Sequence, residues 1–131
     1  MVSLPIRVDA VDKRILIFMS ALRTPLEKKD MHRMVYEMQS RGVRFGFEFI
    51  GKPPFSEELQ RRVDRLVKKG YLQEVLLVKP EYFKLYSTYY LITERGEKIA
   101  KRMDVDKKDI KRIIDYVEGI KSKKTSQESG G

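Results

Sequence analysis

The sequence predicts an α+β fold, because two kinds of apolar periodicity occupy different parts of the chain. Apolar residues recur at helical spacing over residues 11–42, 56–70 and 93–120. Two runs rich in Val, Leu, Ile and Tyr, residues 71–78 and 84–92, flank the short segment KPEYFK. Such runs on either side of a short connection are typical of a β-hairpin. At 131 residues, one ordinary domain with an additional helix or tail is expected.

The first two helices have clear local signals. Residues 11–22 are dense enough in apolar side chains for a buried helix. The segment Thr24-Pro25-Leu26-Glu27 matches a capping box with proline at the first helical position, so a second helix is predicted to begin there. Gly42 supplies its expected end. The second helix should turn four apolar residues into the core: Met31, Met34, Val35 and Met38.

Residues 44–50 alternate aromatic and other side chains, which predicts a short strand. The Gly51-Lys52 pair that follows raises the question of a phosphate-binding loop. Such a loop needs small residues with free N–H groups and a hydroxyl after the lysine. Here Pro53 and Pro54 follow the lysine, and proline has no N–H to donate. We therefore interpret this segment as a connection between a strand and a helix.

Ser56 is placed to cap a third helix that ends at Gly70. Its inward stripe is predicted to comprise Leu59, Val63, Leu66 and Val67. At about 100 degrees per residue, the opposite face carries a set of charged side chains. That set is Glu57, Arg61, Asp64, Arg65 and Lys68.

Helices are also predicted after the hairpin. Thr93 should cap a fourth helix, and Ile99, Ala100 and Met103 should pack inward from it. A fifth helix is predicted over residues 106–120, and residues 121–131 are polar enough to be disordered. The fifth helix has an apolar stripe that could dock on its own core or pair with a second subunit: Ile110, Ile113, Ile114 and Val117.

The composition limits the kinds of function that the chain can have. The formal charge is +9, and the excess is concentrated before Met103, which favours an anionic partner, with a solvated basic surface as the alternative. The chain has no Cys and one His, so we expect no metal site, no cofactor and no catalytic residues, with His32 in an ordinary structural role. No apolar run reaches membrane-spanning length, and a cytoplasmic protein is expected.

The stretch SEELQRRVDRLVKKGYLQEV, followed by YSTYYLITERGEKIAKRM, resembles the winged helix-turn-helix of PadR-like and MarR-like transcriptional regulators. The resemblance covers residues 56–103 and, more loosely, the two helices before them. It implies three helices plus a hairpin wing in residues 1–103, with 104–120 as an additional helix. It further implies a regulator that binds double-stranded DNA as a dimer, paired through this terminal helix.

If the resemblance holds, the third helix enters the major groove and the wing contacts phosphate. Arginine suits the helix because its planar fork bonds guanine or phosphate bidentately. The wing would contribute Lys79 and Lys84. On the helix, the implied DNA-facing residues are Ser56, Glu57, Gln60, Arg61, Asp64, Arg65 and Lys68.

The segment GKPPFS also resembles the turn before a helix in Panacea-type antitoxin-associated winged-helix domains. Members of that group are linked to protein recognition as much as to DNA. Tyr82 and Phe83, at the predicted wing tip, could fill a partner's pocket, because aromatic side chains bury large areas. The alternative function is therefore a protein-interaction module.

Overall fold

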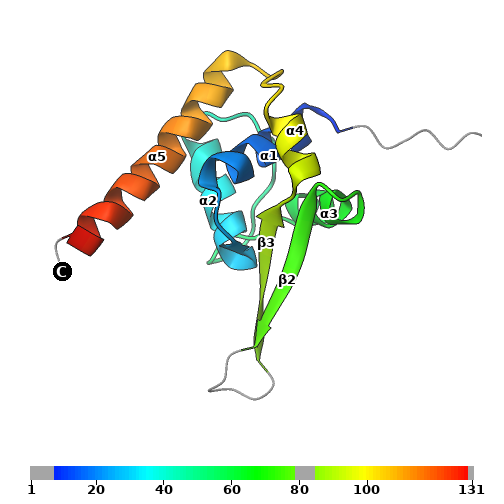
Figure 1. The fold of residues 1–131 in the computed structure, drawn as a ribbon, viewed down its shortest axis with the longest axis vertical. Coiled ribbons are helices and arrows are strands. Elements are labelled where there is room, and N and C mark those ends of the chain that lie inside the picture. The colour runs from blue at the N-terminus through cyan, green and yellow to red at the C-terminus, as the bar shows by residue number, and fades with distance from the viewer. Residues whose placement is uncertain (1–7, 79–84, 130–131) are drawn as a thin grey trace, which may run out of the picture.

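The computed structural model describes residues 8–78 and 85–129, and helix α1 (Ala10–Leu22) lies at the centre of the fold. Five consecutive residues of α1, numbers 15–19, are buried, because the helix is covered on several sides by α4, α5 and β3. Figure 1 shows it, in blue, enclosed by the other helices. The Asp9 side chain caps α1 by accepting a hydrogen bond from the Asp12 N–H at 2.9 Å.

The five helices and the hairpin occur in the predicted order, whereas the two short strands of the first half differ from the prediction. After α1 come the short strand β1 (Leu26–Glu27), α2 (Lys28–Ser40) and α3 (Glu57–Lys68). The hairpin strands β2 (Leu72–Val78) and β3 (Tyr86–Ile92) follow. Helices α4 (Glu94–Ala100) and α5 (Lys107–Ser129) complete the chain. The α+β class is confirmed, and the order α1, β1, α2, α3, β2, β3 is compatible with the winged-helix expectation.

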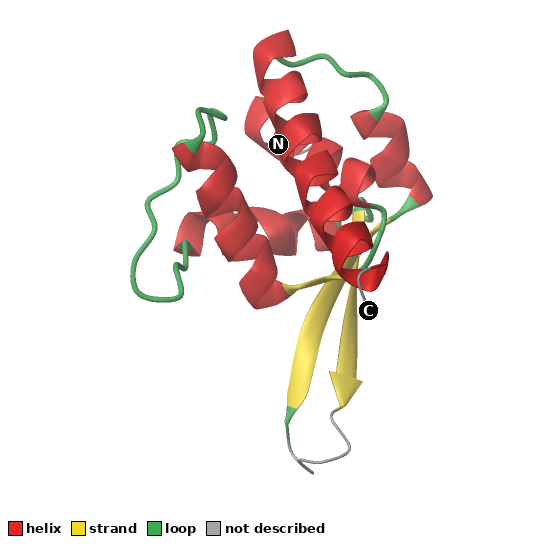
Figure 2. Cartoon of the chain, turned by 90° about the vertical axis from the view of Figure 1, so that its left-hand side faces the viewer, coloured by secondary structure: helices red, strands yellow, loops and turns green. Residues whose placement is uncertain are grey.

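The sheet has the strand order β1, β3, β2 and is antiparallel throughout. Its base lies within the helical body, where Leu72 pairs with Ile92 and β1 pairs with β3 at Tyr90. Its outer half projects away from the helices in both side views (Figures 1 and 2). Because β3 lies in the middle of this strand order, β2 forms one edge of the sheet.

The capping-box prediction at residues 24–27 is wrong. Leu26 and Glu27 pair with Tyr90 and Tyr89 of β3, and α2 begins only at Lys28. Glu27 precedes the helix without a capping hydrogen bond from its side chain. The buried Leu26 side chain and the pairing with a strand more than sixty residues away override the local signal.

The predicted strand at residues 44–50 is also absent, although its alternation is correct. Phe45 and Phe47 are buried, as expected for one face of an extended segment. No ladder forms, because the Gln39 side chain takes the place of a neighbouring strand. Its amide donates to the Phe47 carbonyl and accepts from the Phe47 N–H, both at 2.9 Å. An isolated bridge between Ile50 and Phe55 then closes the turn.

Helix α5 differs from the prediction in length and in packing. It continues to Ser129, through most of the segment expected to be disordered. Ile113 and Val117 are buried in this chain's own core, so they do not form the predicted dimer surface. Ile110 and Ile114 are half-buried. Just before α5, Met103 was expected to pack inward but is 43% exposed.

A buried ion pair fixes α5 to the central helix. Asp109 is fully buried and accepts a hydrogen bond from Nε of Arg14 at 2.8 Å. Arg44 approaches the same carboxylate at 3.3 Å from the loop after α2. Helix α5 thus packs into the same core as the preceding residues.

Candidate nucleic-acid interface

Helix α3 begins at a buried cap. The Ser56 hydroxyl accepts from the Leu59 N–H at 3.2 Å, as predicted, and the Ser56 N–H donates to Nδ1 of His32 at 3.1 Å. Ser56 is only 1% exposed, so its predicted role as a DNA contact is wrong. A serine hydroxyl can contact a base or cap a helix. Here the Ser56 hydroxyl caps α3.

The two faces of α3 divide as the sequence predicts. Leu59, Val63 and Leu66 are buried against the body. The α3 outer face comprises Glu57, Arg61, Asp64 and Lys68, which are exposed, and Arg65, which is half-buried. A shallow groove of about 670 Å³ runs along this face to Glu74 of β2. Gly70, with φ of 85°, then turns the chain from α3 into the hairpin.

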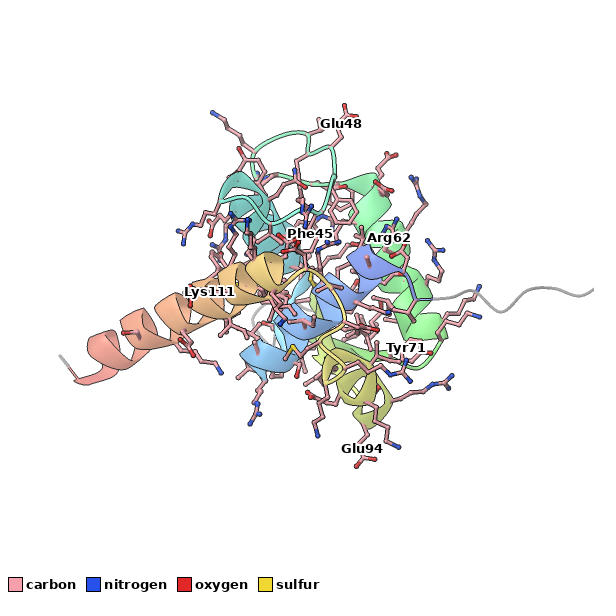
Figure 3. All side chains as sticks on the ribbon, turned by 90° about the horizontal axis from the view of Figure 1, so that it is seen from above. Phe45, Glu48, Arg62, Tyr71, Glu94 and Lys111 are labelled. Carbon is pink, nitrogen blue, oxygen red and sulfur yellow. The ribbon has the colours of Figure 1, made fainter. Side chains whose placement is uncertain are left out.

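Arg62 lies between α3 and the start of α1 and is neutralised by carboxylates. Its Nη1 contacts Asp9 at 2.8 Å and Asp12 at 3.1 Å, and its Nη2 lies 3.7 Å from Glu58. Figure 3 places Arg62 between α3 and the start of α1, and its side chain is only 16% exposed. The sequence did not single out this arginine, because Asp9 and Asp12, its two nearest partners, lie fifty or more residues away. Arg62 holds the α3 framework together and is unavailable to a ligand.

The two carboxylates on Arg62 respond differently to their surroundings. Burial raises the pKa of Asp12 above its usual value, and the hydrogen bond from Arg62 only partly offsets this effect. At the more exposed Asp9, burial also raises the pKa, but hydrogen bonds from Arg62 and the Asp12 N–H outweigh it and the net pKa is lowered. Asp9 therefore remains the firmly charged partner of Arg62.

The cations on the outer face of α3 contrast with Arg62. Among the described residues, Arg61, Arg65 and Lys68 form no ion pair. They recur at spacings of three and four residues, which places them along one side of the helix. Three positive groups thus line a groove without a carboxylate bound to any of them.

A network of buried polar groups holds α3 against α2 and β3. His32, 1% exposed, accepts from the Ser56 N–H through Nδ1, so its proton lies on Nε2 and donates to Oε1 of Gln60 at 2.9 Å. The Gln60 amide in turn donates to the Tyr90 hydroxyl at 3.0 Å and to Asp64 at 2.8 Å. The Phe55 ring stacks on His32 at 4.2 Å.

This network changes the roles of two predicted residues. Gln60, expected to face DNA, is half-buried and holds α3 to its neighbours. His32, expected to be ordinary, is the residue that joins α2 to the start of α3. Burial lowers the pKa of His32, and the nearby Lys28 charge acts in the same direction, against the Gln60 hydrogen bond. The imidazole is therefore neutral and structural.

The first turn of α3 is acidic, in contrast to its later turns. Glu57, Glu58 and Glu48 surround a groove of about 490 Å³ whose apolar wall is formed by Ile50 and Phe55. Figure 3 places Glu48 at the outer edge of the molecule. The charge on this side of the protein therefore changes sign along α3, from negative at its beginning to positive after Arg61.

The described, exposed residues of the outer half of the hairpin are apolar. We define this outer half by the exposed residues Leu76, Leu77, Val78, Leu85 and Tyr86. The predicted wing contacts Lys79 and Lys84 and the predicted tip aromatics Tyr82 and Phe83 lie outside the described residues. Tyr86, at the start of β3, is 61% exposed.

Three further findings concern metal binding, membrane spanning and a second pocket. In the part of the chain that the structure describes, no group of three His, Asp or Glu residues is arranged to bind a metal ion. Within the same residues, no helix combines the length and the apolarity needed to span a bilayer. A pocket of about 350 Å³ lies between the α2 N-terminus and β3, lined in part by Lys28, Phe55 and Tyr86.

Comparison with known proteins gives one relative. The chain is similar to the uncharacterized protein YwgA of Bacillus subtilis (strain 168), with 31% identity over 100 residues. The match covers 73% of this chain and 57% of YwgA, so the chain corresponds to little more than half of that protein's length. No family model matches the chain, and no solved structure gives a significant match.

Proposed function

We propose that this chain is a winged-helix protein that binds double-stranded DNA through the outer face of α3 and acts as a transcriptional regulator. The observation that carries the proposal is the contrast between neighbouring arginines of one helix. Arg62 is bound by Asp9, Asp12 and Glu58, whereas Arg61 has no ion-pair partner among the described residues. Carboxylates therefore neutralise Arg62, whereas the cations on the outer face of α3 can bind an anion such as phosphate.

The mechanism follows from where these cations lie. Arg61, Arg65 and Lys68 line the groove between α3 and β2 together with the carboxylates Asp64 and Glu74. A DNA backbone along this face would meet three positive charges against two negative ones. Arginine can bond two phosphate oxygens or the O6 and N7 atoms of guanine. The acidic first turn repels phosphate, and Glu57 there can accept a hydrogen bond only from a donor such as the amino group of cytosine. Contact with the backbone is therefore expected from Arg61 onward.

The test is binding of the purified protein to random duplex fragments at several salt concentrations. Each phosphate contact contributes a slope of about 0.9 in the logarithm of affinity against the logarithm of salt. Replacing both Arg61 and Arg65 by Gln should lower the affinity and reduce that slope by about 2. The matched control replaces Lys98 of α4 and Lys101, which directly follows α4, by Gln; both are exposed, and the change removes the same net charge.

The two double variants separate a localised interface from general charge. If both lose affinity equally, DNA is attracted by net charge alone and the assignment to α3 is wrong. If the wild-type protein binds no duplex even at about 50 mM salt, DNA binding itself is wrong.

Protein recognition is a second candidate function, favoured by the apolar outer half of the hairpin. Patches of this kind on a soluble domain mark interaction sites more often than solvated surfaces. The same DNA measurement discriminates, since a protein-interaction module would lack a salt-dependent duplex affinity that depends on Arg61 and Arg65.

A further inference from the structure

Strand β2 presents an unprotected edge. It pairs with β3 on one side only, and among the described residues no hydrogen bond joins its outer edge to another element. Exposed edges in stable proteins are commonly blunted by lysine, proline or a bulge. The seven residues of β2, LQEVLLV, contain neither lysine nor proline, and their register with β3 is continuous. Lys79 and Pro80 follow directly in the sequence, outside the described residues. Such an edge is a template for another strand.

Both faces of the same strand are apolar in its outer half. Leu76 and Val78 lie on one face with their partners Thr88 and Tyr86, and Leu77 lies on the other. These three residues of β2 are 53%, 68% and 50% exposed. A globular partner resting on one face would leave the other in water. Only an added strand covers the edge and shields side chains on both faces together.

We propose that the occupant is a second copy of this chain, with β2 of each copy pairing antiparallel across a two-fold axis. Self-pairing needs no other partner, and a two-fold axis makes the contact reciprocal, so that each residue of one strand faces a different residue of the other except at the axis itself. Glu74 is the one charged residue in β2, so like charges are few along the contact. The result is a six-stranded sheet shared by two protomers.

The size of the surface predicts a weak dimer. The outer half of the hairpin offers five exposed apolar side chains, whereas a standard stable interface has about 20–30 residues on each side. A standard stable interface buries about 800 Å² on each partner. The strand backbone adds to the apolar patch, so association is expected at about micromolar concentration.

This pairing differs from the dimer expected through α5. Ile113 and Val117, the middle of the α5 stripe, are already buried in the chain's own core. Helix α5 therefore offers only the half-buried Ile110 and Ile114, whereas β2 offers a complete edge. The inference stands independently of DNA binding.

The first experiment measures molar mass by sedimentation over a concentration series without DNA. Replacing Leu76 and Leu77 by Lys puts like charges of the two copies on the paired edge, where they repel each other, and should raise the dimer dissociation constant about a hundredfold. The matched control is Ile50→Lys, which adds a charge at an apolar residue that is 70% exposed but lies on the turn before α3. It should dimerise as the wild type does.

The second experiment uses the absence of cysteine from the chain. Single cysteines placed at each position from 73 to 78 are oxidised, and the covalent dimer is measured. A disulfide requires Cα atoms about 4.4–6.8 Å apart, so crosslinking should peak at one position or two adjacent ones, where the two-fold axis passes. Ile50→Cys provides the background level.

A monomer at all concentrations would overturn the proposal, as would a dimer that the two lysines leave intact or a flat crosslinking profile equal to background. Failure of DNA binding is recognised separately. In that case the mass measurements still report pairing, and the salt dependence of duplex affinity is absent.

Discussion

The two halves of the β2–β3 hairpin contain the same kinds of residue in opposite surroundings. At the base, Leu72 and Tyr90 are 2% and 1% exposed, and the Tyr90 hydroxyl accepts from Gln60. In the outer half, Leu77 and Tyr86 are 50% and 61% exposed. The base of the hairpin is thus part of the hydrophobic core, whereas the apolar side chains of the outer half do not contribute to the core of a single chain.

The largest expected effect separates two leucines of one strand. Leu72→Ala removes a fully packed side chain and should cost about 2–5 kcal/mol of unfolding free energy. Leu77→Ala removes the same atoms from an exposed position and should change it by no more than about 0.5 kcal/mol. Urea unfolding of both variants, at a concentration where the protein is monomeric, tests the difference. Equal costs would mean that the outer half is packed in the monomer.

A second pair of variants tests how closely the base of the hairpin is held by α4. A Cβ at Gly96 would lie 2.2 Å from the Tyr71 carbonyl oxygen, a backbone atom, so Gly96→Ala should destabilise the protein by about 1–3 kcal/mol. Gly119 of α5 has no atom within 4 Å of such a Cβ, so Gly119→Ala should stabilise the helix by about 1 kcal/mol. Thermal melts of the two variants should move in opposite directions.

The smallest expected effect is on how the unfolding free energy depends on pH. It tests the hydrogen-bond network of His32, which holds the base of the hairpin. Because the folded pKa of His32 is lowered, the unfolded chain binds a proton more readily. This contribution to stability is present above the unfolded pKa of about 6.5 and is lost as the pH falls toward and through the lower folded value. His32→Gln should flatten the decline between pH 7 and pH 5. Because His32 is the only histidine, unfolding curves across that range isolate it; an unchanged slope would contradict the network.

The parts of the fold that could be predicted depend on neighbours in sequence. The Ser56 cap, the α3 stripe and the end of α3 at Gly70 rest on residues within one or two turns, and all three are confirmed. Residues 24–27 and 44–50 were assigned wrongly because their backbone partners are distant: β3 for Leu26 and the Gln39 side chain for Phe47. Propensity carries no information about such partners.

The candidate site shows the same limit. The spacing on α3 correctly placed Arg61, Asp64 and Lys68 on the exposed side. It could not show that Arg62 meets carboxylates near the N-terminus of α1, or that Gln60 is held by His32 and Tyr90. Those roles come from contacts across twenty-eight to fifty-three residues of chain.

The contact between His32 and the start of α3 has a consequence for insertions. The angle of α3 is fixed by side chains reaching from α2 and β3, while the turn at residues 51–54 is closed locally by the bridge between Ile50 and Phe55. Residues inserted between Ile50 and Phe55 should therefore leave the orientation of α3 unchanged. Loop length adds only slowly to the entropic cost of closure, so this turn is a natural position for grafting an epitope or a fluorescent label.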